Sequence, residues 1–275
     1  MPEKLVFNGS FKTKSERSNV LLLLPKTKGP FGTETFKNFI KDNFNLLEYD
    51  DVQTEALGIF DKNSVTSLED KASAVNIALQ NWKGIEFHII CHSTGCGLGA
   101  FLAKKNKKTC RSLVLISPWN KTDEDFTTIQ KRRVENAKTL ETILFLKSEY
   151  NLLYSSEYID KFEKQFYRHM LDRKDNNVDV DRIEKRLQSI LDCDLGKELC
   201  DLMLPKLFIN ALDDRLMKVH HGQNLQKIST NSKLISLDTG GHMLTETRAV
   251  DLNIYIKSFI DSLGKEYECK PKIIK

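Results

Sequence analysis

The chain has 275 residues, of which 40% are hydrophobic and 29% charged, and its formal net charge is +4. This length suits one large domain, or a core that carries an inserted subdomain, and the composition is that of a globular protein. The basic charge is mild and spread along the chain, unlike the dense basic stripe of a nucleic-acid binder. The longest aliphatic run, Val20–Leu24, is too short to cross a bilayer. We therefore expect neither nucleic-acid binding nor membrane insertion.

The six cysteines match neither a zinc site nor a compact disulfide framework in their spacing. Free thiols in a reducing compartment are the simplest interpretation. The N-terminal stretch lacks the apolar core of a secretory signal. We expect a cytoplasmic protein without a bound metal.

Short apolar segments alternate with helical patterns up to residue 118. Ser67 precedes one such helix as an N-cap residue, with Asp70 three positions later. This alternation predicts a parallel sheet covered by helices. We expect a leading hairpin at 4–7 and 10–14, strands at 19–24, 45–50, 86–91 and 111–117, and helices at 67–82 and 94–106.

Residues 119–204 contain no convincing strand and have the pattern of charged amphipathic helices, at 124–147, 157–171, 180–191 and 196–202. The alternation then resumes with strands at 206–214 and 233–238 and helices at 219–228 and 245–263. The sequence therefore predicts a core of residues 1–118 and 205–265, a helical cap over 119–204, and a tail at 266–275.

The stretch EFHIICHSTGCGLGA, residues 86–100, has the form of a nucleophile elbow. It joins an apolar strand to a helix rich in small residues through a turn at Ser93. The residues two before and two after the apex must be small because strand and helix crowd together there, and here they are Cys91 and Gly95. Taken alone, the pattern fits a helix-capping serine equally well.

A serine nucleophile requires a base, and an acid that orients the base. Asp213 and Asp214 follow the first strand after the helical segment, and His242 follows the last strand behind two glycines. We predict a triad of Ser93, Asp214 and His242, because Asp214 directly precedes the point where the chain turns towards a helix. Asp213 is then a turn residue or a helix-side contact, and His92 is a structural residue that points away from the apex.

Stabilising the developing oxyanion requires two backbone N–H groups. We expect one from Thr94, directly after the nucleophile. The other should come from the loop after residue 24, from Lys26 or alternatively from Thr27, since Pro25 has no N–H to donate.

These stretches together resemble the α/β-hydrolase superfamily, over nearly the whole chain. Within it, they are most similar to the aminoacrylate hydrolases of pyrimidine utilisation (the RutD type), whose neighbours are enol-lactonases and carbon–carbon hydrolases. The resemblance is carried by the elbow and by RSLVLISPWN, FINALDDRLM and TGGHMLTET, at 111–120, 208–217 and 239–247. Two departures are Cys91 in place of the more common glycine and Leu24-Pro25 in place of the usual His-Gly pair.

The resemblance implies an α/β fold with a mostly parallel eight-stranded sheet and an all-helical cap. It also implies cofactor-independent hydrolysis of a small carboxylic ester, lactone, thioester, or carbamate- or amide-like substrate. Trp119, Phe31 and Met243 are candidate pocket residues, with core packing as an equal alternative for Phe31 and Met243. The basic run at 131–133 is expected on the solvent face of a cap helix, and the alternative is that it attracts a substrate carboxylate. A homodimer is left open. The alternative function is a binding protein of this fold with weak turnover.

Overall fold

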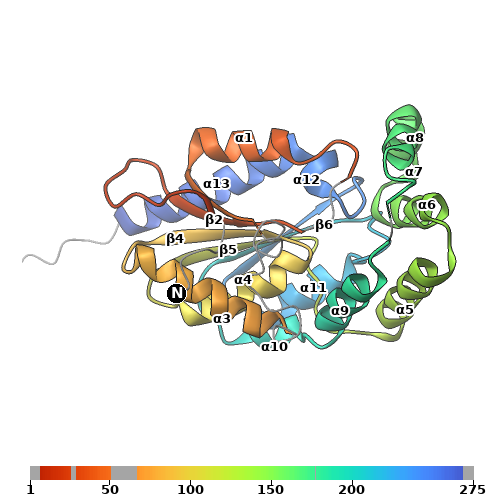
Figure 1. The fold of residues 1–275 in the computed structure, drawn as a ribbon. Helices are drawn as coiled ribbons and strands as arrows, with labels where there is room; N and C mark the ends of the chain where they lie inside the picture. Colours follow the sequence, from red (N-terminus) through yellow and green to blue (C-terminus); the bar gives the residue numbers. More distant parts are fainter. Residues whose placement is uncertain (1–6, 26–28, 51–66, 177, 269–275) are drawn as a thin grey trace, which may run out of the picture.

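Seven strands form one sheet at the centre of the molecule, in the order β1-β3-β2-β4-β5-β6-β7 (Figure 1). The computed structural model describes residues 7–25, 29–50, 67–176 and 178–268. β1 runs antiparallel to β3, and the other neighbouring pairs of described strands are parallel. The strands are β1 (Phe7–Gly9), β2 (Asn19–Leu23), β3 (Asn45–Tyr49), β4 (Phe87–His92), β5 (Cys110–Ile116), β6 (Lys206–Ala211) and β7 (Ser232–Leu237).

The mostly parallel sheet is confirmed, but the described residues form seven strands where eight were expected. The expected leading hairpin is wrong, because β1 pairs with β3 instead, with Phe7 opposite Tyr49. Residues 10–14 form no strand. In this segment the Lys12 N–H donates to the Asn19 side chain at 2.8 Å, and Phe11 turns inward to stack on Phe87. These are tertiary contacts that local alternation of polar and apolar residues does not reveal.

Helices cover both faces of the sheet (Figure 1). β2 shows how the sequence sets this up: Val20 and Leu22 belong to one apolar core, and Leu21 and Leu23 to the other. Burying each such side chain contributes about 1.5–3 kcal/mol, which favours helices on both sides. The first face carries α1 (Glu34–Asn43), α12 (Leu244–Thr247) and α13 (Ala249–Glu268), and the second carries α3 (Leu68–Leu79), α4 (Thr94–Lys105), α10 (Leu195–Cys200) and α11 (His220–Ile228).

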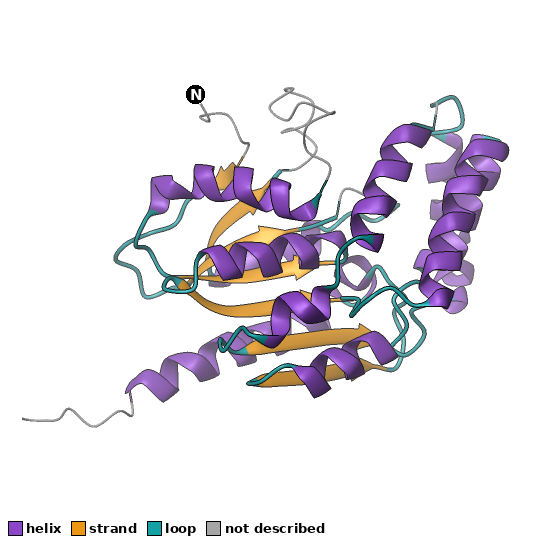
Figure 2. Ribbon diagram, turned by 90° about the horizontal axis from the view of Figure 1, so that it is seen from below, coloured by secondary structure: helices purple, strands orange, loops and turns teal. Residues whose placement is uncertain are grey.

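Helices α5–α10 lie between β5 and β6, where the sequence predicts a helical segment. Figures 1 and 2 show α5–α8 beyond the ends to which the parallel strands point. By contrast, α10 packs beside the sheet against α4 and α11. The expected helices at 124–147 and 157–171 each divide in two, because the chain becomes extended at Leu140 and leaves helical geometry at Phe162. The four resulting helices are α5 (Glu124–Thr139), α6 (Thr142–Leu153), α7 (Ser156–Lys161) and α8 (Glu163–Leu171). The helix predicted at 180–191 is confirmed as α9 (Val180–Leu191).

None of the helices that the structure describes combines the length and the apolar character needed to cross a membrane. The N-cap predicted for α3 is present, since the Ser67 Oγ accepts a hydrogen bond from the Asp70 N–H at 3.0 Å.

The start of α4 lies so close to its neighbours that glycine is required there. A Cβ on Gly95 would come within 2.3 Å of the Leu23 carbonyl oxygen. One turn later, a Cβ on Gly99 would lie 3.0 Å from the Cys91 sulfur. Because residue 99 has no side chain, there is room for the Cys91 side chain at a position where glycine is more common.

We expect Gly95→Ala to lower the free energy of unfolding by about 3 kcal/mol, because its methyl group would collide with backbone that cannot rotate away. Gly99→Ala is the matched comparison, since its closest neighbour is a side-chain sulfur. Urea unfolding of both variants measures the difference. An equal loss in the two variants would contradict this account.

Candidate active site

Ser93 occupies the sharp turn between β4 and α4, with φ 53° and ψ −123°. This left-handed conformation is costly for a residue other than glycine and persists only where its surroundings enforce it. The Ser93 N–H donates to the Ile116 carbonyl at 2.9 Å, and the Ser93 carbonyl accepts from the Cys96 N–H at 2.8 Å. The strand–turn–helix geometry expected of a nucleophile elbow is therefore present, with Ser93 at its apex.

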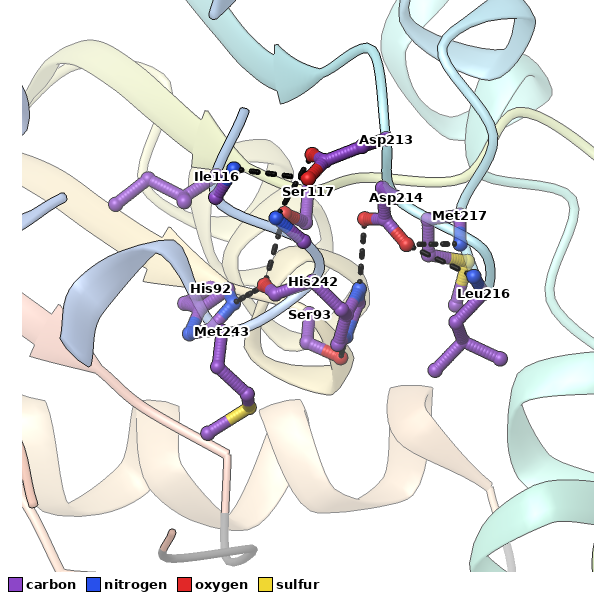
Figure 3. A network of polar contacts seen from close by, with 12 residues as sticks. His92, Ser93, Ile116, Ser117, Asp213, Asp214, Leu216, Met217, His242 and Met243 are labelled. Carbon is purple, nitrogen blue, oxygen red and sulfur yellow. Dashed lines mark hydrogen bonds and ion pairs between the residues drawn. The ribbon is translucent and has the colours of Figure 1, made fainter. Parts of the chain in front are cut away.

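Ser93, His242 and Asp214 are joined by consecutive hydrogen bonds (Figure 3). His242 Nε2 lies 2.8 Å from Ser93 Oγ, and Nδ1 lies 2.9 Å from Asp214 Oδ2. An ionised carboxylate can only accept, so Nδ1 carries the proton that it donates to Asp214. Nε2 is then free to accept the Ser93 hydroxyl proton. All three side chains are buried, with exposures of 8% for Ser93, 2% for His242 and 3% for Asp214.

The two adjacent aspartates have different hydrogen-bond partners. Asp214 Oδ1 accepts from the N–H groups of Leu216 and Met217 at 2.9 and 2.8 Å, which leaves Oδ2 for His242. Asp213 instead accepts from the N–H groups of Gly240 and Gly241 at 3.2 and 2.9 Å (Figure 3). The structure therefore brings Asp214 to the imidazole, whereas Asp213 secures the loop that carries it.

That loop bends at Gly240 and Gly241, which have φ values of 140° and 65°. A Cβ on Gly241 would lie within 2.9 Å of backbone atoms of Tyr154 and Ser155 at the end of α6. This close approach lets the N–H groups of His242 and Met243 donate to the Leu153 carbonyl, the first at 2.8 Å. The imidazole is thus positioned partly by α6.

His92 and Ser117 support the same loop from the sheet side. The His242 carbonyl accepts from His92 Nε2 at 2.9 Å and from Ser117 Oγ at 3.2 Å. Because a carbonyl can only accept, His92 carries its proton on Nε2, and its Nδ1 accepts from Thr245 Oγ1 at 3.1 Å. Burial, and then the nearby His242, lower the pKa of His92 to about 3. His92 is therefore a neutral structural residue, as expected from the sequence.

A narrow cavity of about 20 Å³ adjoins Ser93 and His242. This volume holds about one water-sized group. The core and helices α5, α6 and α9 all contribute to its walls. The described lining residues are Pro25, Ser93, Thr94, Gln130, Arg133, Leu153, Arg186, Leu187, Ile190, Leu216, Met217, His242 and Met243.

Among the expected pocket and oxyanion residues, Thr94 and Met243 line this cavity, whereas Trp119 and Phe31 do not. Trp119 is fully buried in the core, where its Nε1 donates to the Cys193 carbonyl at 2.8 Å. The Phe31 ring contacts Phe162 and other aromatic rings of α7 and α8. The expected second oxyanion donor, Lys26 or Thr27, lies outside the described residues.

The basic run at 131–133 is divided between solvent and the interior, which corrects the expected solvent-facing placement. Lys131 and Arg132 are exposed, but Arg133 is only 6% exposed and lines the cavity. Its Nε and Nη2 donate to the two carboxylate oxygens of Glu149 on α6 at 2.9 and 2.6 Å, and its Nη1 donates to Gln130 Oε1 at 3.0 Å.

The spacing of buried residues along α5 already indicates that Gln130 and Arg133 face inward, contrary to the expected solvent-facing placement of the basic run. The buried residues of α5 are Phe126, Gln130, Arg133 and Ala137. Their spacing places all four on one helix face, so Gln130 and Arg133 interrupt an inward-facing stripe. Polar residues in such a stripe indicate either buried pairing or a lined cavity.

A second polar cluster lies at the start of α5, where Asp123, His220 and His221 bring their donor atoms within 4.8 Å of one another. The Asp123 carboxylate already caps α5 through the Phe126 N–H at 2.8 Å and contacts His220 Nε2 at 2.9 Å. Burial, and then the neighbouring His220, lower the pKa of His221 to about 4, so this ring is neutral. These three residues are the group in the described part of the chain that could hold a metal ion.

Comparison with known proteins agrees with this architecture. The family model described as the alpha/beta hydrolase fold matches residues 61–249. This match covers more than half of the chain, which therefore belongs to the α/β-hydrolase fold family, as predicted, and is a hydrolase.

Individual proteins are similar to this chain in sequence or in fold. The chain is 26% identical over 204 residues to "Putative carbamate hydrolase RutD" of Acinetobacter baylyi, covering 70% of this chain and 75% of that one, which confirms the predicted RutD-type resemblance. An alpha/beta hydrolase, MGS-M2, from a Medee basin deep-sea metagenome library has a TM-score of 0.73 at 17% identity, covering 98% and 96% of the two chains. The enol-lactonase from Burkholderia xenovorans LB400 has a TM-score of 0.69 at 14% identity, covering 93% and 96%. These two structures share the fold.

We expect Arg133→Met to lower the free energy of unfolding by about 3–5 kcal/mol near neutral pH, because Glu149 would be left buried without its partner. Burial alone would raise the pKa of Glu149, but the charge and hydrogen bonds of Arg133 outweigh it and lower the pKa. The stabilisation from the pair is therefore complete above the ordinary glutamate pKa of about 4.3, and is lost as the pH falls through the lower folded-state value.

The deficit of Arg133→Met should shrink on acidification, since the unpaired Glu149 can then take up a proton. Urea unfolding at about pH 7 and about pH 5 measures this change. The double variant Arg133→Met/Glu149→Gln is the control, and its deficit should be smaller and independent of pH. A deficit in the single variant that is the same at both pH values would show that Glu149 is not the cause.

Proposed function

We propose that this chain is a cofactor-independent serine hydrolase in which Ser93 is the nucleophile, His242 the general base and Asp214 the residue that orients the base. The observation that carries the proposal is the 2.8 Å hydrogen bond from Ser93 Oγ to His242 Nε2, continued at 2.9 Å from Nδ1 to Asp214. Its short length and burial put the hydroxyl proton within reach of its acceptor before a substrate arrives.

The first half-reaction uses this chain of contacts directly. As Ser93 Oγ bonds to the substrate carbonyl carbon, its proton moves to His242 Nε2, and the Asp214 carboxylate stabilises the resulting imidazolium. The imidazolium then protonates the leaving oxygen, sulfur or nitrogen, whose bond to the carbonyl carbon breaks. In the second half, His242 takes a proton from water, which attacks the acyl group, and the proton returns to Ser93 as the acid product leaves.

The negative charge on the carbonyl oxygen would be stabilised by the Thr94 N–H at the first position of α4. Thr94 lines the cavity together with Ser93, which supports this role. The second donor is expected from Lys26 or Thr27.

The relatives support a class of substrate. They include a protein described as a carbamate hydrolase, which supports a carbamate- or amide-like compound among the candidates. We therefore propose a small carboxylic ester, lactone, thioester, or carbamate- or amide-like substrate, with α5–α9 acting as a cap over the site. The described cysteines are free, four of them buried, which supports a reducing compartment such as the cytoplasm.

A fluorophosphonate probe should label the wild-type protein, and Ser93→Ala should abolish labelling, because the probe bonds to an activated serine. His242→Ala should reduce ester turnover by about 10³-fold or more without loss of the fold. Ser73→Ala, at a half-buried serine of α3 that lies outside the cavity, is the control and should label normally. Mass spectrometry measures the labelling, initial rates of ester hydrolysis measure the turnover, and circular dichroism checks the fold. If the wild type takes no label between about pH 6 and pH 9, the binding-protein alternative is favoured.

Turnover should decrease as the solution is acidified, because a protonated imidazole has no electron pair for the Ser93 proton. The low pKa of His92, about 3, keeps that neighbouring ring from contributing to the change. Initial rates between about pH 8 and pH 5 measure this dependence. A flat profile with an unchanged fold would contradict the role given to His242.

A further inference from the structure

The side of the cavity formed by α5 and α9 presents hydrogen-bond donors. Gln130 and Arg133 come from α5, and Arg186 comes from α9, which packs against α5. The described lining residues include no aspartate or glutamate. A group bound there must therefore supply acceptors, and negative charge would be favoured.

The orientation of the Gln130 amide is fixed by its neighbour. Gln130 Oε1 accepts from Arg133 Nη1 at 3.0 Å. A guanidinium can only donate, so the oxygen must face Arg133 and the NH₂ group must face elsewhere. That Nε2 is buried and has no hydrogen-bond partner, although Gln130 is only 1% exposed and lines the cavity. Buried donors are almost always paired, so the Gln130 NH₂ group indicates an acceptor in the cavity, either a water or a ligand group that displaces it.

Arg133 is held in place by a carboxylate behind it. Glu149 binds its Nε and Nη2, and Gln130 binds its Nη1, so these contacts use three of the five guanidinium N–H groups. This bidentate pairing fixes the plane of the guanidinium in the free protein. A ligand that binds there therefore does not have to immobilise the Arg133 side chain. The positive charge of Arg186, which lines the same cavity, also contributes to the low pKa of Glu149.

We propose that Gln130, Arg133 and Arg186 form a subsite for a carboxylate of the substrate, separate from the carbonyl that Ser93 attacks. This inference rests on the proposed hydrolase function and narrows it to short acids that carry the scissile bond. A carboxylate offers two acceptor oxygens in one plane, which suits an amide NH₂ beside a guanidinium fork.

A purely structural network between α5 and α6 would account for Arg133, Glu149 and the Gln130 oxygen that accepts from Arg133. It leaves the buried Gln130 NH₂ group without a partner. The position of the donors in the wall next to Ser93 is therefore better explained by recognition than by packing alone.

The test compares two esters of the same size and shape, monoethyl succinate and ethyl 4-oxopentanoate, which carry a carboxylate and a methyl ketone at the far end. Wild-type kcat/KM, measured by acid release, should be roughly tenfold to a hundredfold higher for the acid.

Gln130→Glu keeps the side-chain shape but places a carboxylate in the subsite, and Arg186→Gln removes one cation. Each should lower the ratio of the two kcat/KM values by about tenfold or more. Arg132→Gln, at the exposed arginine of α5, is the matched control and should leave the ratio unchanged.

A wild-type ratio near one, or a ratio that neither variant changes, would overturn the subsite. A binding measurement separates this outcome from failure of the hydrolase proposal. In Ser93→Ala, ligand-observed NMR should show that propanoate binds more tightly than propanamide, and adding Arg186→Gln should remove the difference. Hydrolysis of the neutral ester with no preference for propanoate would overturn the subsite alone. Preference for propanoate in Ser93→Ala without hydrolysis by the wild type would overturn the hydrolase proposal alone.

Discussion

Parallel pairing of β4, β5, β6 and β7 is the constraint on which the rest of the site depends. The register sets His92 opposite Ile116, Ile116 opposite Ile209, and Ala211 opposite Leu237. Strand ends aligned in this way bring the turns that follow them to one edge of the sheet. The serine, aspartate and histidine loops meet there although they are far apart in the sequence (Figure 3). A shift of register in any one pair would separate them.

The strained serine depends on a second constraint, the close packing of β4 and α4. Gly95 allows the helix to approach the Leu23 carbonyl, and Gly99 makes room for the Cys91 side chain. Cys91 Sγ donates to the Val114 carbonyl at 3.1 Å, and burial raises its pKa well above the ordinary value. Cys91 is therefore an inert packing residue, and this departure from the family pattern leaves the elbow geometry intact.

The sequence predicts those features that depend on local periodicity and order along the chain. The strands of the parallel sheet and the turn at Ser93 follow from the order of apolar segments and turns, and the choice of Asp214 over Asp213 follows from where the chain turns towards a helix. Features that depend on distant partners could not be predicted. Trp119 points into the core because the Cys193 carbonyl accepts its N–H there, and Arg133 turns inward because Glu149 on the next helix receives it. Neither partner is evident from the residues around Trp119 or Arg133.

Helix α6 contacts both halves of the site. Its Leu153 carbonyl receives the backbone of the histidine loop, and one turn earlier its Glu149 holds the guanidinium of Arg133. Any displacement of α6 would disturb the imidazole and the arginine together. Helix α6 thus couples the position of the imidazole to that of the guanidinium, so that neither can shift independently of the other.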